Sequence, residues 1–546
     1  MRTSFCATTG LGQTESERDM TPDQMRIVLQ QDAPEPMLRA EVAEPIEPEA
    51  LIEHSIGLIR DLPIDVYASD VNHAGGVYYR SKVAEPMLSR PSSFRGRDHV
   101  RMAERLQSLF DRGTDPLEIY CGAAHEAGKA YAVRLRMNDL HDVVSGVDIE
   151  RPRTGPEDPI GEPYYYTSTY KQEHPEYLMG DVYGPSPDPF ERWQRSALNY
   201  ALGPVRSHVL GMVDEMVTGY DIDVLELDFI RFAFVFRRAE AFAQRHVLTS
   251  LIRRIKEMCH AEGKRRGRPV YLSARVPDSL ELGLRAGIDT REWLRQGLLD
   301  LVVIGGGYSP LTTEWENIAD EARSCGVTAQ ACLNHGRFDK DVRRIRASAL
   351  RAFEAGVSGL VLWNFWYCFD YYHPRGENPL TLDFTRELAE PDSLGRSELA
   401  ISLDPSWDPL SLLGGAHSHH SWPGQVPMMI GVAEDGFGQT VTFDVPEAAL
   451  KVRVGAEDAA LNVEIENYWA PDDEMQLFWN DRLLPTEFEL RAQAGQEVYR
   501  LTAAVPIEWM VAGSNRLELR LVKLHVRVDP FVRLLAGALQ LAAPGN

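Results

Sequence analysis

The sequence predicts an α/β fold, a (β/α)8 (TIM) barrel followed by an all-β, sandwich-like C-terminal domain. Through residues 55–392, short apolar strands alternate with longer amphipathic patterns, as repeated βα units do. Over residues 393–546, segments such as LKVRVGAE and NRLELRLVKLHVRV alternate apolar and polar residues between turn signals, which is typical of a β-sandwich. A chain of 546 residues also needs more than one hydrophobic core.

Seven barrel strands follow from their apolar runs, at 64–70, 130–137, 222–229, 270–277, 300–305, 328–334 and 359–365. Helical patterns separate them, for example at 240–262 and 339–356. We expect the eighth strand either within 160–190 or before residue 55, and residues 1–54 to be an N-terminal extension partly packed on the barrel. No glycine-rich phosphate loop follows the first strand, which argues against an open doubly wound sheet.

Two other segments have predicted structures. Residues 141–195 are long for a connection and rich in aromatic residues, so we expect a lid or a wall of the substrate site there. The apolar tail FVRLLAGALQLAA is predicted to be a short helix docked on a domain.

Composition excludes several classes of protein. With 57 basic and 81 acidic residues, the net charge of -24 disfavours nucleic-acid binding. The six cysteines form no CxxC motif, so neither a zinc site nor a disulfide framework is predicted. No apolar run reaches the ~18 residues of a membrane helix. The chain as given is expected to be cytoplasmic, whereas a signal peptide upstream of the given start would make it periplasmic or secreted.

The most informative segment is YDIDVLELDFIRF, the predicted fourth strand. Side chains alternate across a strand, so Glu226 and Asp228 share one face, and Leu225, Leu227 and Phe229 share the other. In a barrel the apolar face meets the helices, and the two acids therefore point inward. Asp228 is the outer of the two, at the C-terminal mouth where barrel enzymes work. We predict Asp228 and Glu226 as catalytic residues.

Buried carboxylates need partners, and neighbouring strands supply arginines. Arg134 and Arg136 share one face of the second strand with Asn138, and Arg275 faces the same way on the fifth. A purely structural salt bridge between Arg134 and Glu226 remains an equal alternative. Together with Arg231, Arg136 and Arg275 are expected to form a locally positive pocket that could grip a sugar carboxylate or sulfate.

Polar and aromatic residues gather at most predicted strand ends, where stability alone would favour apolar residues. The predicted substrate-binding residues are Asp70, His73, Arg136, Asn138, Asp139, Arg231, Arg275, Tyr308, Asn334, His335, Asn364 and Trp366. Asp70, His73, Asp228 and His335 could converge on a metal ion, but no HxH or HExxH spacing is present, so no metal or other cofactor is predicted. A serine nucleophile is disfavoured because no GxSxG occurs.

The chain resembles the glycoside-hydrolase-like (β/α)8 families that are distantly related to family 10 glycoside hydrolases. The matching pieces are DVNHAGGVYY, RMND, DIDVLELDFIRF and LVLWNF, within residues 55–390. The resemblance implies processing of a poly- or oligosaccharide, a catalytic acid on the fourth strand and an accessory, carbohydrate-binding C-terminal domain. The fourth strand is also similar to the DxxDxDxE signature of chitinase-type barrels. Here, however, the outermost acid is Asp228 and not a glutamate, which weakens that second likeness.

The sequence therefore predicts hydrolysis of a glycosidic bond, with Asp228 as nucleophile or base. The partner acid is left open among Glu226, Asp139, Asp278 and Glu314. Two alternatives remain: a non-catalytic glycan-binding barrel, and a lyase, dehydratase or epimerase that acts on an acidic sugar. The expected partner is a carbohydrate. Neither a nucleic acid nor a membrane is expected, and the oligomeric state is left open.

Overall fold

The structure is a computed structural model. It describes residues 20–32, 37, 42–73, 75–87, 97–140, 168–180, 194–230, 232–306, 315–334, 341–364, 382–403, 425–433, 435–469, 472–493, 496–525 and 532–544.

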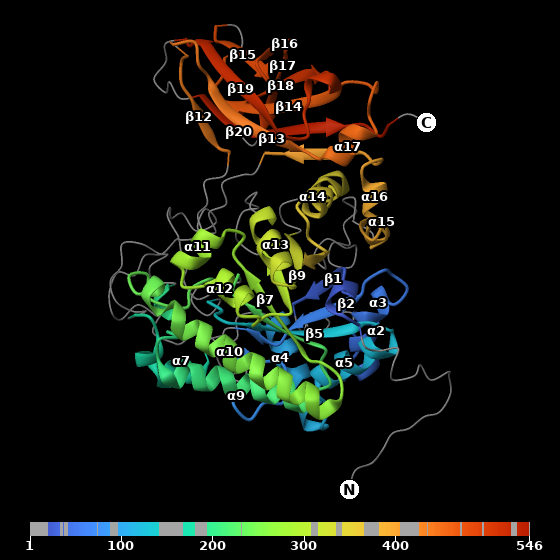
Figure 1. The fold of residues 1–546 in the computed structure, drawn as a ribbon, viewed down its shortest axis with the longest axis vertical. Coiled ribbons are helices and arrows are strands. Elements are labelled where there is room, and N and C mark those ends of the chain that lie inside the picture. The colour runs from blue at the N-terminus through green and yellow to red at the C-terminus, as the bar shows by residue number, and fades with distance from the viewer. Residues whose placement is uncertain are drawn as a thin grey trace.

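A closed barrel of parallel strands forms the first part of the chain (Figure 1). Its members are β1 (Ile27–Gln31), β2 (Val66–Asp70), β5 (Ala130–Arg136), β6 (Val224–Asp228), β7 (Tyr271–Val276), β8 (Leu301–Ile304), β9 (Thr328–Asn334) and β10 (Gly359–Trp363). Each strand pairs in parallel with the next along the chain, and β1 closes the ring by pairing with both β2 and β10. The predicted barrel class is confirmed.

The eighth strand is β1, so it lies before residue 55, which was one of the two expected places. The barrel therefore begins at Ile27, inside the segment that was expected to be an extension. Residues 168–180, the described part of the other expected place, contain helix α7 (Thr169–Glu173) and a short 3-10 turn. All five residues of β1 are buried, including Gln30 and Gln31, so the segment shows neither the alternation nor the continuous apolar run that would mark a strand in the sequence.

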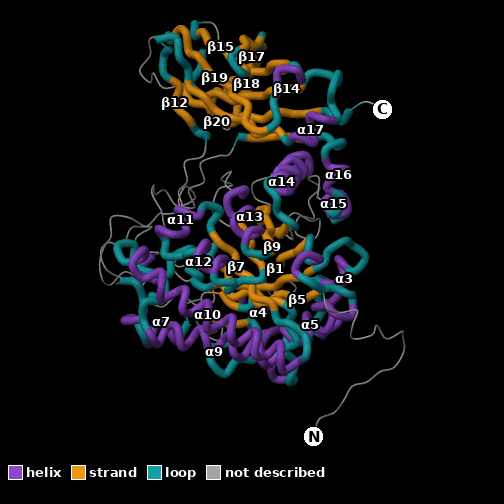
Figure 2. The backbone as a smooth tube through the Cα atoms, viewed as in Figure 1, coloured by secondary structure: helices purple, strands orange, loops and turns teal. Residues whose placement is uncertain are grey.

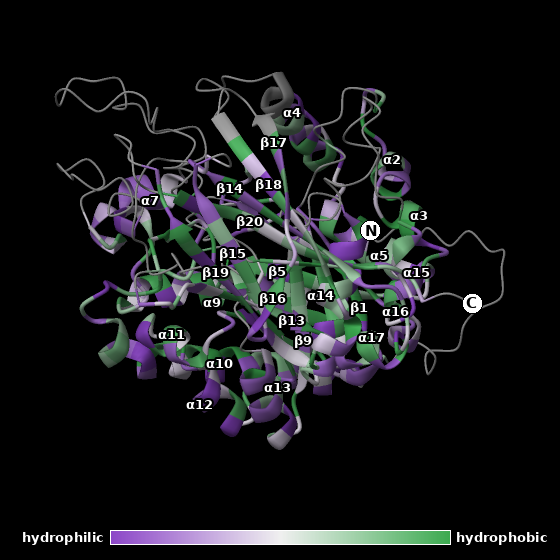
Figure 3. Ribbon diagram, turned by 90° about the horizontal axis from the view of Figure 1, so that it is seen from above, coloured by the Kyte–Doolittle hydropathy of each residue, from purple (hydrophilic) through white to green (hydrophobic). Residues whose placement is uncertain are grey.

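Helices cover the outside of the barrel, as Figure 2 shows in purple around the orange strands. The longer ones are α4 (Arg97–Asp111), α5 (Pro116–Glu126), α9 (Gly203–Gly219), α10 (Ala241–Arg266), α13 (Trp315–Ser324) and α14 (Val342–Glu354). The shorter ones are α2 (Pro48–Glu53), α3 (Ile56–Ile59), α11 (Leu280–Arg285), α12 (Thr290–Arg295), α15 (Phe384–Leu388) and α16 (Pro391–Leu394). The peripheral helices in Figure 3 carry both hydrophilic and hydrophobic residues, as helices that cover a core on one side do. No described helix is both long and apolar enough to cross a membrane.

Local sequence signals explain where these helices begin and end. The carboxylate of Asp115 accepts a hydrogen bond from the Leu117 amide at 2.9 Å, and Pro116 occupies the first turn of α5. Helix α10 ends at Gly267, whose φ of 79° places it in the left-handed region that glycine adopts without strain. The same caps are readable in the sequence.

The C-terminal part consists of two antiparallel sheets, and the predicted β domain is confirmed. One sheet contains β11 (Leu399–Ser402), β20 (Val532–Leu541), β14 (Ala459–Glu466), β18 (Gln496–Val505), β17 (Glu487–Gln493) and β12 (Met428–Ile430). The other contains β13 (Gln439–Val445), β19 (Gly513–Lys523), β15 (Glu474–Trp479) and β16 (Arg482–Leu484). Between the sheets, a Cβ built on Gly537 of β20 would lie 3.3 Å from the Phe443 ring of β13, so the two layers pack closely there.

The predicted C-terminal helix is wrong, because its residues form strand β20. Burial along Val532–Leu541 follows the alternation of a strand more than the period of a helix. The strand pairs with β11, β12 and β14, so tertiary pairing overrides the helix preference of its leucines and alanines.

Helix α14 joins the two parts (Figure 1). The guanidinium of Arg351 lies 2.5 Å from the Asp444 carboxylate. The carboxylate of Glu354 accepts hydrogen bonds from the amides of Glu447 and Ala448, at 3.0 and 2.8 Å, where the short helix α17 (Glu447–Lys451) begins. The β domain is therefore held against the barrel by specific polar contacts.

The place of β1 in the barrel leads to the first prediction. A Cβ on Gly359, the first residue of β10, would collide with the backbone of Arg26 just before β1. We expect Gly359→Ala to lower the free energy of unfolding by about 1–3 kcal/mol, because backbone must move to admit the methyl group. Urea denaturation measures this change. The matched control is Gly122→Ala in α5, where nothing lies within 4 Å of the new methyl group, and a gain of about 0.5–1 kcal/mol is expected. Equal stability of the two variants would contradict the placement of β1.

Candidate active site

The inside of the barrel is apolar at one end and charged at the other. Toward the N-terminal ends of the strands, small and branched side chains such as Val66, Ala132 and Val224 form a buried cluster. Toward the C-terminal ends, many inward positions instead carry buried acids, arginines and a hydroxyl group: Asp70, Arg134, Arg136, Glu226, Asp228, Ser273 and Arg275. The charged layer thus lies at the end where barrel enzymes place their chemistry.

Strand β6 has the predicted orientation. Leu225, Leu227 and Phe229 belong to the outer core beneath the helices. Glu226 and Asp228 instead contact the arginines of neighbouring strands inside the barrel. The two-residue period of the strand therefore places both acids in the same layer of charged side chains inside the barrel, as the sequence indicated.

Arg134 lies at the centre of this layer. Its Nε is 2.6 Å from Glu226 Oε1 and 3.8 Å from Asp70 Oδ1, and its Nη2 is 3.7 Å from Asp228 Oδ2. The register of the barrel explains this arrangement, because Arg134 is directly opposite Asp70 on one side and Glu226 on the other. One guanidinium therefore connects acids from β2 and β6.

Asp228 has its own partner in Arg275. The Nε and Nη2 of Arg275 donate to the two carboxylate oxygens at 2.9 and 2.6 Å, and the Ile230 amide donates to Asp228 Oδ1 at 2.9 Å. Burial alone would raise the pKa of Asp228, but the charges of Arg275 and Arg134 outweigh burial and lower the pKa to about 2. Asp228 is therefore ionised at any ordinary pH.

Arg136 gathers a second group of acids. It donates to Asp70 Oδ2 from Nε and Nη2 at 2.8 and 2.5 Å and to Asp139 Oδ2 from Nη1 at 2.7 Å, and its Nη2 lies 3.0 Å from Asp32 Oδ1. Burial of Asp70, together with the charge and hydrogen bond of Asp32, raises its pKa to about 7. The charges of Arg136 and Arg134 oppose this rise. Asp70 and Asp228 thus have opposite pKa shifts within one layer.

Sequence reasoning did not find Asp32. It directly follows β1, and a strand whose place was left open gives no reason to examine the residue after it. The rule that polar residues at barrel strand ends are candidates would have selected it once β1 was located.

The expected locally positive pocket does not form from the described residues. Arg136 and Arg275 are bonded to carboxylates. The connected group consists of three guanidiniums, on Arg134, Arg136 and Arg275, and five carboxylates, on Asp32, Asp70, Asp139, Glu226 and Asp228. The charges of the arginines are therefore already matched inside the barrel.

Three other predicted residues are described, and they have different roles. The Asn138 side chain accepts from the Leu198 amide at 3.0 Å and donates to the carbonyls of Leu198 and Phe234. Its hydrogen bonds therefore hold the segment before α9 and the segment after β6 at the end of β5. His73 Nε2 lies 3.9 Å from Asp139 Oδ1 at the edge of the charged layer. The backbone N–H of Asn364 donates to Gln30 Oε1 at 3.0 Å, and this hydrogen bond joins the ends of β10 and β1.

The remaining predicted residues cannot be placed. Arg231, Tyr308, His335, Trp366 and the acid candidate Glu314 lie outside the described residues, and Asn334 is described only as the last residue of β9. Of the long 141–195 connection, only 168–180 and 194–195 are described. The acid candidate Asp278 is buried close to Gly305 at the end of β8. Across the described ranges, no group of three or more His, Cys, Asp or Glu residues is arranged to hold a metal ion.

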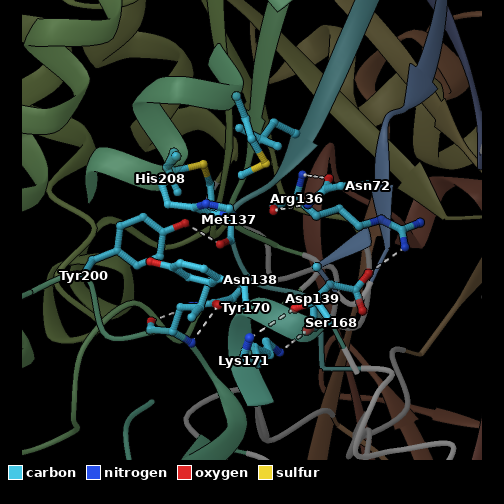
Figure 4. Close-up of a pocket in the computed structure, with 15 residues that line it drawn as sticks. Asn72, Arg136, Met137, Asn138, Asp139, Ser168, Tyr170, Lys171, Tyr200 and His208 are labelled. Atoms are coloured by element: carbon cyan, nitrogen blue, oxygen red, sulfur yellow. Dashed lines mark hydrogen bonds and ion pairs between the residues drawn. The ribbon is translucent and has the colours of Figure 1, made fainter. Parts of the chain in front are cut away.

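A small cavity lies beside the charged layer, at the C-terminal end of β5 (Figure 4). Its volume is about 30 Å³, which is the share of one water molecule in the liquid, so it is too small for a sugar. Lys171, Ser168 and Tyr170 line it together with helix α9, and Lys171 Nζ donates to the Asp139 carbonyl at 3.1 Å. The hydrogen bond of Lys171 holds the α7 segment against Asp139, and Asp228 does not line this cavity.

The fold and the site define a closed (β/α)8 barrel with a charged interior and a β domain. No family model matches the chain, and no curated protein matches it. Many solved structures are similar to it at low identity, among them three enzymes that act on carbohydrates. A cycloisomaltooligosaccharide glucanotransferase of Paenibacillus sp. has 11% identity and a TM-score of 0.30, over 94% of this chain and 57% of that one. An α-L-fucosidase of Paenibacillus thiaminolyticus has 13% identity and a TM-score of 0.39, over 67% of this chain and 48% of that one.

The endo-β-1,4-mannanase of Thermotoga petrophila has 10% identity and a TM-score of 0.38, over 95% of this chain and 99% of that one. The chain thus spans only about half the length of the first two of these proteins. Similarity at this level identifies neither a family nor an activity, and the likeness to relatives of family 10 glycoside hydrolases stays a prediction.

The central position of Arg134 leads to a second prediction. Arg134→Met would leave Glu226 without its 2.6 Å partner inside the barrel. We expect the free energy of unfolding to fall by about 3–5 kcal/mol, because a buried charge then has no counter-ion. The matched control is Arg285→Met, which removes an arginine from an exposed pair with Glu281 and should cost less than about 1 kcal/mol. Chemical denaturation of both variants tests this, and an equal effect would contradict the central role of Arg134.

The lowered pKa of Asp228 leads to a third prediction. Its pKa is about 2 in the folded chain against 3.8 ordinarily, so the native state holds fewer protons between these values, and stability rises with pH there. We expect this group to contribute about 2 kcal/mol above pH ~4, lost as pH falls to ~2. The difference in unfolding free energy between wild type and Asp228→Asn should therefore shrink across that window. A difference that does not depend on pH would show that Asp228 has no such shift.

Proposed function

We propose that this protein is a glycoside hydrolase that cleaves an O-glycosidic bond of a poly- or oligosaccharide at the C-terminal mouth of the barrel. The proposal combines the resemblance of the strand motifs with the chemistry of the charged layer. Glycoside hydrolysis requires two carboxyl groups, one that protonates the leaving oxygen and one that is ionised.

The observation that carries the proposal is the shared contact of Asp70 and Asp228 with Arg134. The nearest distances are 3.8 and 3.7 Å. Since a guanidinium is small and planar, two carboxylates that both touch it lie less than about 10 Å apart. Glycosidases separate their two carboxyl groups by about 5–5.5 Å or about 6.5–9.5 Å, depending on stereochemistry. The layer therefore supports a pair of acids at a workable separation.

Within this proposal Asp228 is the ionised member. A carboxylate with a pKa of about 2 is a weak base, so the role of general base, which was one of two predicted, fits the geometry less well. The role of nucleophile, or of a fixed negative charge opposite an oxocarbenium-like transition state, suits a permanently ionised group. Glu226, bonded to Arg134, is the supporting acid beneath it.

The charge balance favours a neutral sugar. An anionic substrate would need arginines whose charges are not yet matched, and Arg136 and Arg275 both contact carboxylates already. We therefore propose a neutral glycan as the preferred substrate, in place of the anionic one that the sequence suggested.

Asp228→Asn tests the proposed function. We expect kcat/KM on a responsive glycan to fall more than about a hundredfold, because the negative charge opposite the developing cation is removed. The matched control is Asp223→Asn, a buried acid at the opposite end of β6 that is paired with His125 and Arg268. This control should cost stability and leave turnover near wild type at a permissive temperature.

A screen of neutral and anionic polysaccharides, read by mass spectrometry, supplies the substrate. Activity of Asp228→Asn within about tenfold of wild type would overturn the assignment. Unsaturated or isomerised products would identify a lyase or an epimerase. Glycan binding without turnover by the wild type, and unchanged in Asp228→Asn, would identify a binding protein.

A further inference from the structure

Asp32 and Asp70 form a carboxyl pair that the proposed hydrolytic chemistry has not yet used. They lie at the ends of β1 and β2, which are neighbours in the barrel. Both contact the same nitrogen of Arg136, at 3.0 and 2.5 Å. Gln30 Nε2 donates to Asp32 Oδ1 at 2.9 Å, so that oxygen has two donors around it. The Asp70 side chain is 1% exposed and that of Asp32 is 15% exposed. Asp32 is therefore the member that faces the mouth.

The charges around the pair do not favour two ionised acids. Arg136 and, at 3.8 Å, Arg134 are the cations that face Asp70. Arg136 also contacts Asp139, and Arg134 contacts Glu226 and Asp228. Among the described residues, Tyr78 and His73 are further titratable groups nearby, and His73 Nε2 is 3.9 Å from Asp139. Two carboxylates that close together in a dry site cannot both ionise without a large cost, so one proton shared between them is favoured.

A second observation points to a bound group at this place. Two buried polar atoms at the pair, Asp70 Oδ1 and Arg134 Nη1, have no hydrogen-bond partner among the described residues. Buried polar atoms are nearly always satisfied, and clustered exceptions mark a place for water or ligand. These atoms come from register partners on β2 and β5, so they lie on the same side of the barrel interior.

We propose that Asp32 and Asp70 share one proton and that this pair is the general acid of the reaction, with Asp32 as the residue that touches the substrate. This inference rests on the proposed glycosidase function. The pair gives its proton to the glycosidic oxygen as the bond from that oxygen to the sugar carbon breaks. A water molecule then adds to the sugar carbon, and its proton returns to the pair. The pair is thus restored, and Asp228 takes no part in the proton transfer.

The sequence left the catalytic partner acid of Asp228 open among Glu226, Asp139, Asp278 and Glu314. The first two are bonded to Arg134 and Arg136 through short ion pairs. In the described structure Asp70 is the carboxyl group beside Asp228 whose surroundings favour the protonated form.

The first experiment detects the shared proton without any substrate. Infrared spectra of the full-length protein should show the carbonyl stretch of a protonated carboxyl group, assigned by its shift in D2O, that disappears as pH rises through about 7. Asp70→Asn should abolish this signal. Asp32→Asn should lower the pH at which it disappears, because the charge and the hydrogen bond of Asp32 are lost while Asp70 stays buried. The control Asp300→Asn, which alters an acid paired with Lys256 just before β8, should keep it.

The outcome decides the proposal even if Asp70→Asn fails to fold, since Asp32 is the less buried member. Absence of a protonated carboxyl group in the wild type at about pH 6 would overturn the inference, and so would an unchanged titration of the signal in Asp32→Asn. These results do not depend on turnover. A wild type that shows the signal but hydrolyses no glycan therefore refutes the proposed function separately from the shared proton.

The second experiment tests the use of the proton. On a glycan that the wild type hydrolyses, activity should fall as pH rises through about 7, because the pair loses its proton. Asp32→Asn should lower kcat by about 10²–10⁴-fold at the optimum, and Asp300→Asn should leave it near wild type. A substrate with a leaving group that needs no protonation should recover most of the lost rate. Full activity of Asp32→Asn, or no recovery with such a substrate, would overturn the assignment.

Discussion

The interior of this barrel depends on the pairing of acids with arginines away from water. A buried carboxylate without a counter-ion costs several kcal/mol, and so does a buried guanidinium. Here Arg134 and Arg136 on β5 and Arg275 on β7 lie between acids from β1, β2 and β6. The strands that carry these charges must therefore close in one register, because a shift of one residue would turn each charge toward the outer helices.

The same constraint gives two neighbouring aspartates opposite properties. Asp228 accepts both hydrogen bonds of Arg275 and one from the backbone, and these stabilise its charge. Asp70 shares Arg136 with Asp32 and Asp139, so the positive charge is divided among three acids and cannot offset burial. Environments that separate the pKa values of two carboxyl groups are how an enzyme obtains an acid and an anion from the same residue type.

The outer architecture supports this arrangement from a distance. Strand β1 both closes the ring and places Asp32 next to Asp70. Gln30 connects β1 to Asn364 at the end of β10, so the last strand is tied to the first where the acids lie. Helix α14 covers the barrel and binds the β domain through Arg351 and Glu354. The position of the second domain is therefore coupled to the barrel wall, whereas the described ion pairs of the charged layer lie within the barrel itself.

The sequence by itself determined the barrel class, seven of its strands, the β domain and the inward direction of Glu226 and Asp228, because these depend on local periodicity that any reader of the chain can follow. It also supplied the arginines, whose inward faces follow from the same two-residue period. Only the tertiary structure decided that β1 is the eighth strand, that the apolar tail is a strand of a sheet and that Asp32 meets Asp70 on Arg136. Each of these depends on partners far away in the chain: a short apolar run has no intrinsic place, and the proton affinity of an acid depends on neighbours that only folding brings together.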